Sequence, residues 1–240
     1  MTQPISPLAL NARHALFLDF DGTLAPIQDD PETVWLPDGG AETLMELARR
    51  LDGALAIISG RDVRDLSRRV PGGLWRIGGH GLEVCAPGEA PPETRAQAPR
   101  ALCAAIGAAV AGLDGVRIEP KGAVLAIHYR AAPSAAPVLA ERLGEAVSVA
   151  QGYSLQHGKM VFEAKPDIAH KGTALANMMQ RAAFAGRVPV MVGDDVTDED
   201  AMEAALSAGG SAIKVGEGDT RAPFRLAAPD EIWAWLKGHI

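Results

Sequence analysis

A short apolar run that leads into two acidic residues constrains this chain more than any other segment. Residues 15–18 (Ala-Leu-Phe-Leu) are followed at once by Asp19-Phe20-Asp21-Gly22-Thr23. An apolar run that ends at a turn signal in this way predicts a strand buried in a sheet covered on both faces. Because side chains two residues apart on an extended chain point the same way, we expect Asp19 and Asp21 on one face and Phe20 on the other.

The two carboxylates indicate a kind of chemistry. Crowded carboxylates resist joint ionisation unless a cation neutralises them, and Mg²⁺ prefers hard oxygen ligands. Gly22 and Thr23 then offer backbone N–H groups that can hold a phosphate. The segment is typical of metal-assisted phosphoryl transfer with an aspartate as the covalent acceptor. Taken alone, it is also compatible with a solvated loop, a helix cap or the metal site of a sugar-nucleotide enzyme.

The composition is that of an ordinary globular protein. Of 240 residues, 48% are hydrophobic and 22% are charged, which argues against disorder. The formal net charge of −7 offers no basic surface, so we expect no nucleic-acid partner. Cys85 and Cys103 predict no disulfide scaffold and suit a reducing compartment. Residues 1–12 lack the pattern of a secretory signal and no apolar stretch is long enough to span a bilayer, so we expect a cytoplasmic protein without membrane contact.

Strands and helices alternate in the first third of the chain. We expect strands at residues 15–18, 54–58 and 74–77, and helices at 38–51, with Asp38 as N-cap, and at 63–70. This alternation predicts a parallel sheet with helices on both faces, whose ligands lie outside the carboxyl ends of the strands. Ser59, which follows the second strand, would then lie near Asp19 and Asp21 and could bind an anion at the start of the next helix. The alternative is that Ser59 or Asp62 merely caps that helix.

The order of elements changes after a segment rich in proline and glycine at residues 86–92. The pattern there predicts a helix at 95–111, strands at 116–120 and 123–129, a helix at 134–149, and strands at 153–157 and 159–164. Helix, hairpin, helix and hairpin form an α+β module on its own antiparallel sheet. Because the module is inserted, we assign residues 1–84 and 165–240 to a Rossmann-like α/β core and residues 85–164 to a cap over the active site.

The core then resumes with a second acidic cluster. We expect a helix at 171–185, a strand at 187–192, a helix at 201–208, a strand at 212–215 and a closing helix at 231–237. The strand that ends at Val192 leads into Gly193-Asp194-Asp195 and further acidic residues, which alone could be a charged helix start. Together with Asp19, this cluster supplies a further metal carboxylate, and Lys171 supplies a cation to balance the site.

These clusters occur in an order that resembles the haloacid dehalogenase (HAD) superfamily of phosphatases. The matching motifs are Asp19-Phe20-Asp21-Gly22-Thr23, Ile58-Ser59-Gly60-Arg61, Lys171 and Gly193-Asp194-Asp195. More narrowly, the chain resembles the trehalose-6-phosphate phosphatases. This resemblance rests on His80-Gly81-Leu82-Glu83, Lys121-Gly122 with His128-Tyr129-Arg130, Gly158-Lys159 with Glu163, Lys165-Pro166, and the run from Gly193 to Asp200.

The resemblance implies a role for each of these residues. Asp19 would attack phosphorus and form an aspartyl-phosphate, and Asp21 would protonate the leaving sugar oxygen and then deprotonate water. Ser59 would hydrogen-bond the phosphoryl oxygens, and Lys171 would neutralise charge. Mg²⁺ would be held by Asp19, the backbone carbonyl of Asp21 and Asp194, with Asp195 or Asp198 nearby. The resemblance implies a sugar or phosphate contact by Arg61, and sugar contacts by His80, Glu83, Lys121, Lys159 and Glu163.

The activity implied by the resemblance is hydrolysis of trehalose 6-phosphate to trehalose and phosphate, the last step of trehalose biosynthesis, by a monomer. One alternative is a phosphatase for another sugar or polyol phosphate, such as sucrose phosphate or glucosylglycerol phosphate, which would differ in the cap. Others are a phosphomutase, a signalling module, or a non-catalytic regulatory partner of a trehalose-6-phosphate synthase. The presence of both Asp19 and Asp21 disfavours a non-catalytic role, since a pure receiver needs no acid–base group. Any synthase partner is expected in trans.

Overall fold

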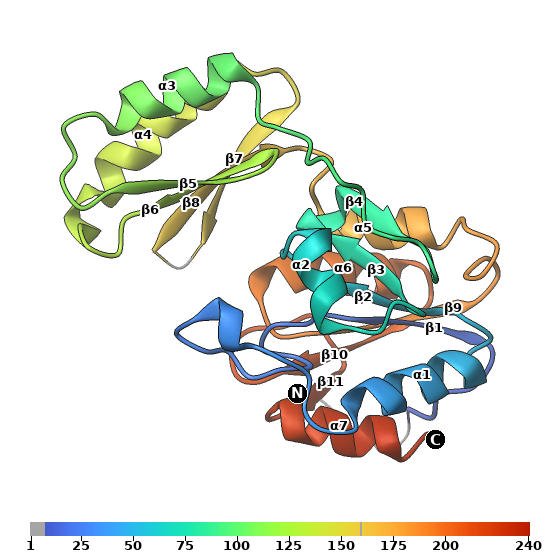
Figure 1. Ribbon diagram of the computed structural model, residues 1–240. Coiled ribbons are helices and arrows are strands. Elements are labelled where there is room, and N and C mark those ends of the chain that lie inside the picture. The colour runs from blue at the N-terminus through green and yellow to red at the C-terminus, as the bar shows by residue number, and fades with distance from the viewer. Residues whose placement is uncertain (1–7, 159) are drawn as a thin grey trace. The chain divides into compact units, whose positions relative to one another are not determined.

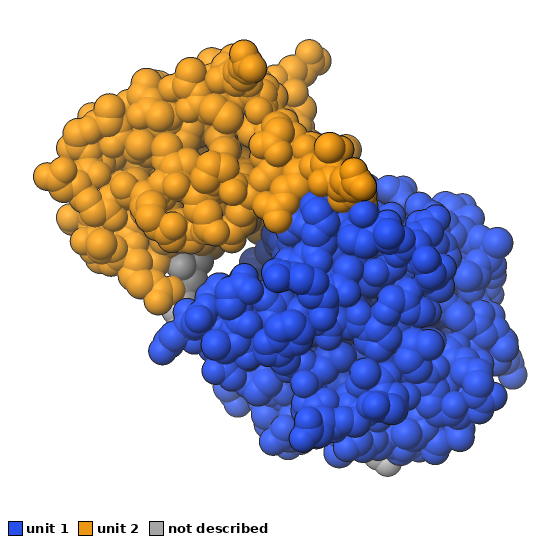
Figure 2. Space-filling model, viewed as in Figure 1, with its two compact units in different colours: residues 1–91, 170–240 blue, residues 92–169 orange. Residues whose placement is uncertain are grey.

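A computed structural model of the chain describes residues 8–158 and 160–240 (Figure 1). The chain forms two compact units, Met1–Pro91 with His170–Ile240 (unit 1) and Pro92–Ala169 (unit 2), which are coloured separately in Figure 2. Unit 2 is therefore inserted in the sequence of unit 1. The sequence-based boundaries at 84/85 and 164/165 would cut two paired strands, Glu83–Cys85 and Val161–Pro166, and each of these strands stays whole within its unit. None of the described helices is both long enough and apolar enough to span a membrane.

Unit 1 is built on a seven-stranded sheet with the order β11-β10-β9-β1-β2-β3-β4. Its strands are β1 His14–Leu18, β2 Leu55–Ile58, β3 Trp75–Gly78, β4 Glu83–Cys85, β9 Val188–Gly193, β10 Ser211–Val215 and β11 Phe224–Leu226. All neighbours pair in parallel except β3 and β4, which are antiparallel. In the centre, Leu18 of β1 lies opposite Ile57 of β2 and Val192 of β9. The predicted parallel α/β core is confirmed.

Helices cover both faces of this sheet because the strands are apolar on both sides. The helices are α1 Gly40–Arg50, α2 Val63–Arg69, α5 Lys171–Met178, α6 Val196–Ser207 and α7 Pro229–Lys237. Leu16 and Leu18 of β1 pack with side chains of α1, α2 and α7, whereas Phe17, which points the other way, packs with side chains of α5 and α6. The central strand is thereby held from two sides, so the residues that follow it start from a rigid base.

Unit 2 has its own core between one sheet and two helices. The helices α3 Arg100–Val110 and α4 Ala136–Val147 lie together on one face of an antiparallel sheet, β5 Arg117–Lys121, β6 Val124–His128, β8 Val161–Pro166 and β7 Tyr153–Gly158 in spatial order (Figure 1). Leu125, Ile127 and Phe162 of the sheet pack against Leu102 and Leu139 of the helices. The other face of the sheet has no helix among the described elements of this unit. The predicted antiparallel sheet with two helices is confirmed.

Several predicted helix ends are wrong, each for a local reason. Asp38 is not the N-cap of α1, because Gly39 holds that position with a left-handed backbone (φ 75°). The helix predicted from residue 95 begins only at Arg100, because a residue that precedes a proline such as Pro99 is disfavoured in the helical conformation. The helix predicted to run to residue 185 ends at Met178, and the turns beyond it bring Phe184 against Phe17.

Three further differences concern the start of one helix and two short strands. The helix predicted from residue 201 begins at Val196, because Asp195 and Asp198 form a capping box at its N-terminus. The sequence did not predict β4 or β11, which are three residues long each and too short to show a periodic pattern. Both are edge strands of the seven-stranded sheet, so the central strands and the residues that follow them are unaffected.

Candidate active site

The predicted site residues of unit 1 gather where parallel strands end. Asp19 follows β1, Ser59 follows the neighbouring strand β2, and Asp194 follows β9 on the other side of β1. The backbone is aligned there, since the Asp19 N–H donates to the Val192 carbonyl at 3.0 Å. Because neighbouring parallel strands end at one edge, these residues meet although they are far apart in the sequence. The predicted convergence of Asp19, Ser59 and Asp194 at one sheet edge therefore has a direct structural basis.

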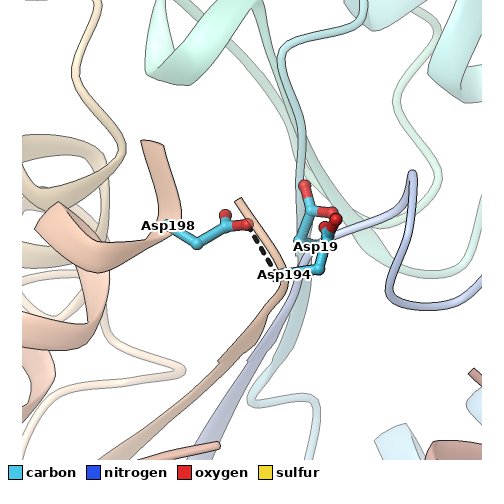
Figure 3. A group of neighbouring side chains, drawn as sticks. All are labelled: Asp19, Asp194 and Asp198. Atoms are coloured by element: carbon cyan, nitrogen blue, oxygen red, sulfur yellow. Dashed lines mark hydrogen bonds between the residues drawn. The ribbon is translucent and has the colours of Figure 1, made fainter. Parts of the chain in front are cut away.

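Three carboxylates form the centre of the site (Figure 3). Asp19, Asp194 and Asp198 each offer an oxygen within 4.8 Å of the others, and Asp19 and Asp198 are buried. Burial and then the charge of Asp198 raise the pKa of Asp19 well above its ordinary value, although Lys171 lowers it. Burial, with the charges of Asp198 and Asp195, raises the pKa of Asp194 to about 6. Buried like charges of this kind call for a further cation, and hard carboxylate oxygens fit a divalent metal ion.

Lys171 is the cation that the chain itself supplies. It is the first residue of α5, and its Nζ donates to Asp19 Oδ1 and to Asp198 Oδ1, both at 2.7 Å. Burial alone would lower the pKa of the Lys171 ammonium, but the charges of Asp19 and Asp198 raise it, so the side chain is charged. One ammonium against three carboxylates still leaves the centre negative. This is the position that the sequence predicted for Lys171.

Asp198 organises the turn between β9 and α6. Its Oδ2 accepts from the backbone N–H groups of Asp194 at 3.1 Å and Asp195 at 3.0 Å, while Oδ1 accepts from Lys171. Asp195, by contrast, is exposed, and its side chain accepts from the Val196 N–H as the N-cap of α6. The sequence left open whether Asp195 or Asp198 supports the metal. The structure brings Asp198 into the carboxylate group and does not bring Asp195 there.

Gly22 and Thr23 shape the loop that faces Asp194. Gly22 has φ +82°, and a Cβ on it would lie 2.1 Å from Asp194 Oδ2, so only glycine lets the loop pass this close. The Thr23 hydroxyl donates to Asp194 Oδ1 at 3.3 Å and is completely buried. The sequence credited Thr23 only with a backbone N–H. Its side-chain role was missed, and a hydroxyl at the end of the acidic motif was the available signal.

Lys214 is a second residue that the sequence missed. It lies in β10 opposite Gly193, is buried, and donates from Nζ to the backbone carbonyl of Asp194. The same Nζ is 3.9 Å from Glu199 Oε1. A lysine inside the apolar run of residues 212–215 was the signal, because a charge there must have a buried partner. Lys214 fixes the backbone that carries Asp194.

Asp21 is held differently from Asp19. Its two carboxylate oxygens accept from Nε and Nη2 of Arg61 at 2.7 and 2.6 Å, and its side chain is 35% exposed. Phe20, between the two aspartates, is fully buried. Ser59 is buried too, and its Oγ accepts from the Arg61 N–H at 3.1 Å, so the hydroxyl proton is free to be donated elsewhere. Asp21, Ser59 and Arg61 thus form a connected group.

His80 and Glu83 lie beside the loop that carries Ser59 and Arg61. His80 has a left-handed backbone, and its N–H donates to the Ser59 carbonyl at 3.0 Å. Its imidazole lies so close to Gly60 that a Cβ there would be 2.6 Å from the ring. Glu83 pairs with Arg64 of α2 at 2.9 Å. His80 and Glu83, like Arg61, therefore lie near the end of β2.

The other predicted sugar contacts belong to unit 2. Lys121 is exposed at the end of β5, with its Nζ 3.9 Å from Glu119 Oε2. Glu163 was expected at or near a hairpin tip but lies within β8, paired with Ala126 and Gln156. Its strand neighbours Phe162 and Ala164 are in the core of unit 2, so Glu163 lies on the helix-free face of the sheet. Lys159 lies outside the described residues.

Comparison with known proteins shows several similarities. Residues 17–230 match a model of the family described as "Trehalose-phosphatase". The chain is 37% identical to "Trehalose-6-phosphate phosphatase" of Escherichia coli (strain K12), over 99% of this chain and 91% of that protein. The solved structure of Aspergillus fumigatus trehalose-6-phosphate phosphatase (crystal form 3) has a TM-score of 0.72 at 26% identity and covers 96% of this chain and 97% of its own. A haloacid dehalogenase-like hydrolase from Bacteroides thetaiotaomicron, 15% identical, shares the fold with a TM-score of 0.64 over 94% of this chain and 98% of its own.

Proposed function

Because the chain belongs to the trehalose-phosphatase family, we propose that it hydrolyses trehalose 6-phosphate to trehalose and phosphate through an aspartyl-phosphate on Asp19. One observation carries this proposal. The Asp19 carboxylate is buried at the end of the central strand, and Lys171 binds one of its oxygens at 2.7 Å. A carboxylate that is held in place by an ammonium group in this way is positioned to attack phosphorus, and a bound cation would offset the remaining repulsion by the phosphate dianion.

In this proposal, residues of unit 1 transfer protons and stabilise charge in two steps, formation and hydrolysis of the aspartyl-phosphate. In the first, a bond forms between Asp19 and phosphorus, the bond from phosphorus to the sugar oxygen breaks, and Asp21 gives that oxygen its proton. In the second, water attacks phosphorus, Asp21 takes the water proton, and Asp19 is released with phosphate. Ser59 is available to donate its hydroxyl proton to a phosphoryl oxygen, because its Oγ accepts from a backbone N–H.

We propose Mg²⁺ as the divalent metal of the site. Asp19 and Asp194 would hold it together with the backbone carbonyl of Asp21, and it would neutralise charge on the transferring phosphoryl group. The raised pKa values of Asp19 and Asp194 support this assignment, because burial and then the charge of Asp198 disfavour both ionised carboxylates, and a bound cation would offset this. Both oxygens of Asp198 already accept hydrogen bonds, from Lys171 and from the backbone. We therefore assign Asp198 to orienting Asp194 and Lys171, and Asp195 to capping α6.

We assign recognition of the sugar to His80 and Glu83 of unit 1 and to Lys121, Lys159 and Glu163 of unit 2. A disaccharide presents many hydroxyls, and selection among such sugars requires polar side chains that are left unpaired by the wrong sugar. The strand register supports this, since it places Lys121 and Glu163 on the same helix-free face of the unit 2 sheet. In this proposal unit 2 is the specificity cap that the sequence placed at residues 85–164.

The remaining expectations are also proposals. We propose a monomeric cytoplasmic enzyme whose substrate is made by a separate trehalose-6-phosphate synthase. Cys85 and Cys103 are free thiols, as suits a reducing compartment. The mass in solution by light scattering tests the monomer, and a second oligomeric state at micromolar concentration would contradict it.

The experiment for the activity is phosphate release in the presence of Mg²⁺ from a panel of substrates. The panel contains trehalose 6-phosphate, sucrose 6-phosphate, glucose 6-phosphate and glucosylglycerol phosphate. We expect a large preference in kcat/KM for trehalose 6-phosphate. A preference for another sugar would retain the chemistry of Asp19 and overturn the assignment of the sugar contacts. No activity on any of them would leave the regulatory role as the better explanation.

A further inference from the structure

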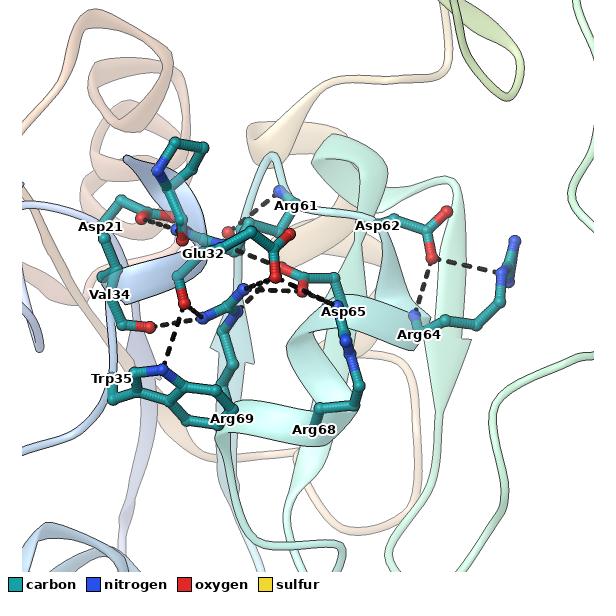
Figure 4. Close-up of polar contacts among 12 residues, drawn as sticks. Asp21, Glu32, Val34, Trp35, Arg61, Asp62, Arg64, Asp65, Arg68 and Arg69 are labelled. Atoms are coloured by element: carbon teal, nitrogen blue, oxygen red, sulfur yellow. Dashed lines mark hydrogen bonds and ion pairs between the residues drawn. The ribbon is translucent and has the colours of Figure 1, made fainter. Parts of the chain in front are cut away.

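Arg61 connects Asp21 to a network of charged side chains (Figure 4). Its Nε and Nη2 donate to the two oxygens of Asp21, its Nη1 donates to Asp65 Oδ2 at 2.8 Å, and Nη2 also donates to the Pro31 carbonyl at 3.0 Å. The side chain is only 11% exposed. Each nitrogen of the guanidinium therefore has an acceptor within unit 1. These contacts favour an action of Arg61 on Asp21 over the sugar or phosphate contact that the family resemblance implies.

Asp65, in α2, is the centre of this network. Its Oδ2 accepts from Arg61 and from Arg69 Nε at 2.9 Å, and its Oδ1 accepts from Arg69 Nη2 at 2.9 Å and Arg68 Nη2 at 2.6 Å. Burial would raise the pKa of Asp65, but the hydrogen bonds from Arg69, Arg61 and Arg68 lower it to about 2. Asp65 is therefore ionised in any ordinary buffer. It is the carboxylate that keeps the guanidinium groups of Arg61 and Arg69 side by side.

Arg69 fastens the network to the loop that follows the Asp19–Asp21 motif. Its side chain is fully buried, its Nη1 donates to the Val34 carbonyl at 2.6 Å, and its guanidinium lies over the Trp35 ring at 4.8 Å. Arg61 holds the same loop through the Pro31 carbonyl. Arg61, which precedes α2, and Arg69, the last residue of α2, thus connect the loop to this helix beside the Asp21 carboxylate (Figure 4).

We propose that Asp65 is a positioning residue: it holds Arg61, and Arg61 orients the Asp21 carboxylate for proton transfer. This inference rests on the acid–base role proposed above for Asp21. A guanidinium that donates hydrogen bonds to both oxygens of a carboxylate fixes the orientation of the carboxylate plane as well as its position, which a point charge cannot do. Asp65 itself touches no reacting atom in this account.

The two hydrogen bonds from the Arg61 guanidinium to Asp21 must change during the reaction, and Asp65 holds the guanidinium while they do. When Asp21 is protonated, ready to donate to the leaving oxygen, its protonated oxygen loses the hydrogen bond from Arg61, and its other oxygen retains one. After the proton has left with the sugar, both oxygens face Arg61 again, and one of them then takes the proton of the attacking water. Asp65 keeps the guanidinium in place through these changes.

The test uses two small substrates of similar size, phenyl phosphate and 4-nitrophenyl phosphate. Phenolate is a more basic leaving group than 4-nitrophenolate and so depends more on a proton from Asp21. The value of kcat/KM includes every step up to departure of the leaving group. We expect Asp65→Asn to lower the ratio of kcat/KM, phenyl over 4-nitrophenyl, by about tenfold, because acid–base catalysis is worth about 10²-fold or more in total. Both rates come from one preparation, so the fraction of folded enzyme cancels, and partial unfolding of a variant does not change the ratio.

Matched variants separate positioning from a purely structural role. Asp65→Glu keeps the carboxylate and should restore the ratio, whereas Arg61→Lys keeps the charge, loses the fork and should lower it. Arg68→Gln removes the most exposed partner of Asp65 and should leave the ratio unchanged, since Arg68 is 63% exposed and does not contact Asp21. On trehalose 6-phosphate, the loss in Asp65→Asn should fall on kcat with KM unchanged.

The outcomes distinguish this inference from the function on which it rests. An unchanged ratio in Asp65→Asn, or a loss on trehalose 6-phosphate that falls on KM, overturns the positioning role while the wild-type activity stands. A wild type that is inactive on trehalose 6-phosphate and on both aryl phosphates overturns the proposed function, and the positioning role falls with it.

Discussion

Asp19 and Asp21 are two residues apart, yet their surroundings are opposite in charge. Around Asp19, Asp194 and Asp198 outnumber the single Lys171, and the pKa of Asp19 is raised. Asp21 is instead bound by the Arg61 guanidinium through both of its oxygens, and the pKa of the nearby Asp65 is lowered by its arginine partners. The Asp19 region lacks positive charge that a metal can bring, whereas the Asp21 region is complete without one. The proposed nucleophile therefore depends on an added ion, and the proposed acid–base group depends on the chain alone.

The change with the largest expected effect is Asp19→Asn. The amide cannot form the aspartyl-phosphate, so turnover of trehalose 6-phosphate should fall by about 10⁴-fold or more, while the fold is retained. Steady-state phosphate release measures the first and circular dichroism the second. Measurable turnover in this variant would defeat the covalent mechanism and with it the distinction between the two aspartates.

Removal of the metal should come next. Chelation should abolish turnover of the wild type, because the Asp19 region then keeps its excess negative charge, and added Mg²⁺ should restore it. Mg²⁺ should also raise the melting temperature of the wild type and do so far less in Asp194→Asn, which is the readout independent of activity. An equal rise in both proteins would place the metal elsewhere.

Glu163→Ala should leave both regions of unit 1 intact and impair only the reading of the sugar. We expect kcat/KM to fall by about 10- to 100-fold on trehalose 6-phosphate and to change little on 4-nitrophenyl phosphate, since the smaller ester has no hydroxyls to recognise. Loss of equal size on the two substrates would remove the role of unit 2 in specificity.

The smallest effect concerns stability and has opposite signs in the two regions. The pKa of Asp194 is raised from 3.8 to about 6, so the stability it contributes is present below about pH 4 and lost as pH rises through about 6. Without metal, Asp194→Asn should therefore raise the free energy of unfolding at pH 8 by about 1–2 kcal/mol. Asp65 has a lowered pKa, so its contribution is present above about pH 4 and lost as pH falls through about 2. Asp65→Asn should accordingly lower the stability at pH 8, as urea titrations of both variants can show.

The sequence predicted the parts of the site that depend on strand ends. Asp19, Ser59 and Asp194 each follow an apolar run, and parallel strands bring such residues to one edge. The choice between Asp195 and Asp198 was out of reach, because both lie in one acidic run and only the capping box decides which side chain turns inward. The partner of Arg61 was equally hidden. Asp65 is four residues after Arg61, but Arg61 precedes α2, so the spacing of residues on a helix does not predict the pair.

The fold was predictable to a similar depth. Long apolar strands and the change of order after residue 86 gave the two units, since these patterns reflect burial on one or both faces. Helix ends depended on single residues, such as Gly39 at α1 and Pro99 at α3, whose effect is set by backbone conformation. The three-residue edge strands β4 and β11 carry too few side chains for any periodicity.

The strand order of unit 1 has a consequence for folding of the protein during its synthesis on the ribosome. The central strand β1 has β9 as one of its neighbours, and the whole of unit 2 is synthesised between them. Unit 2 is continuous in sequence and has its own core, so it can fold before β9 has been synthesised and has paired with β1. Because pairing over such a long stretch is slow, closure of β1 against β9 is the late event. Asp19 and Asp194 first meet at that event, so the nascent chain acquires the proposed catalytic centre only after residue 194 has emerged.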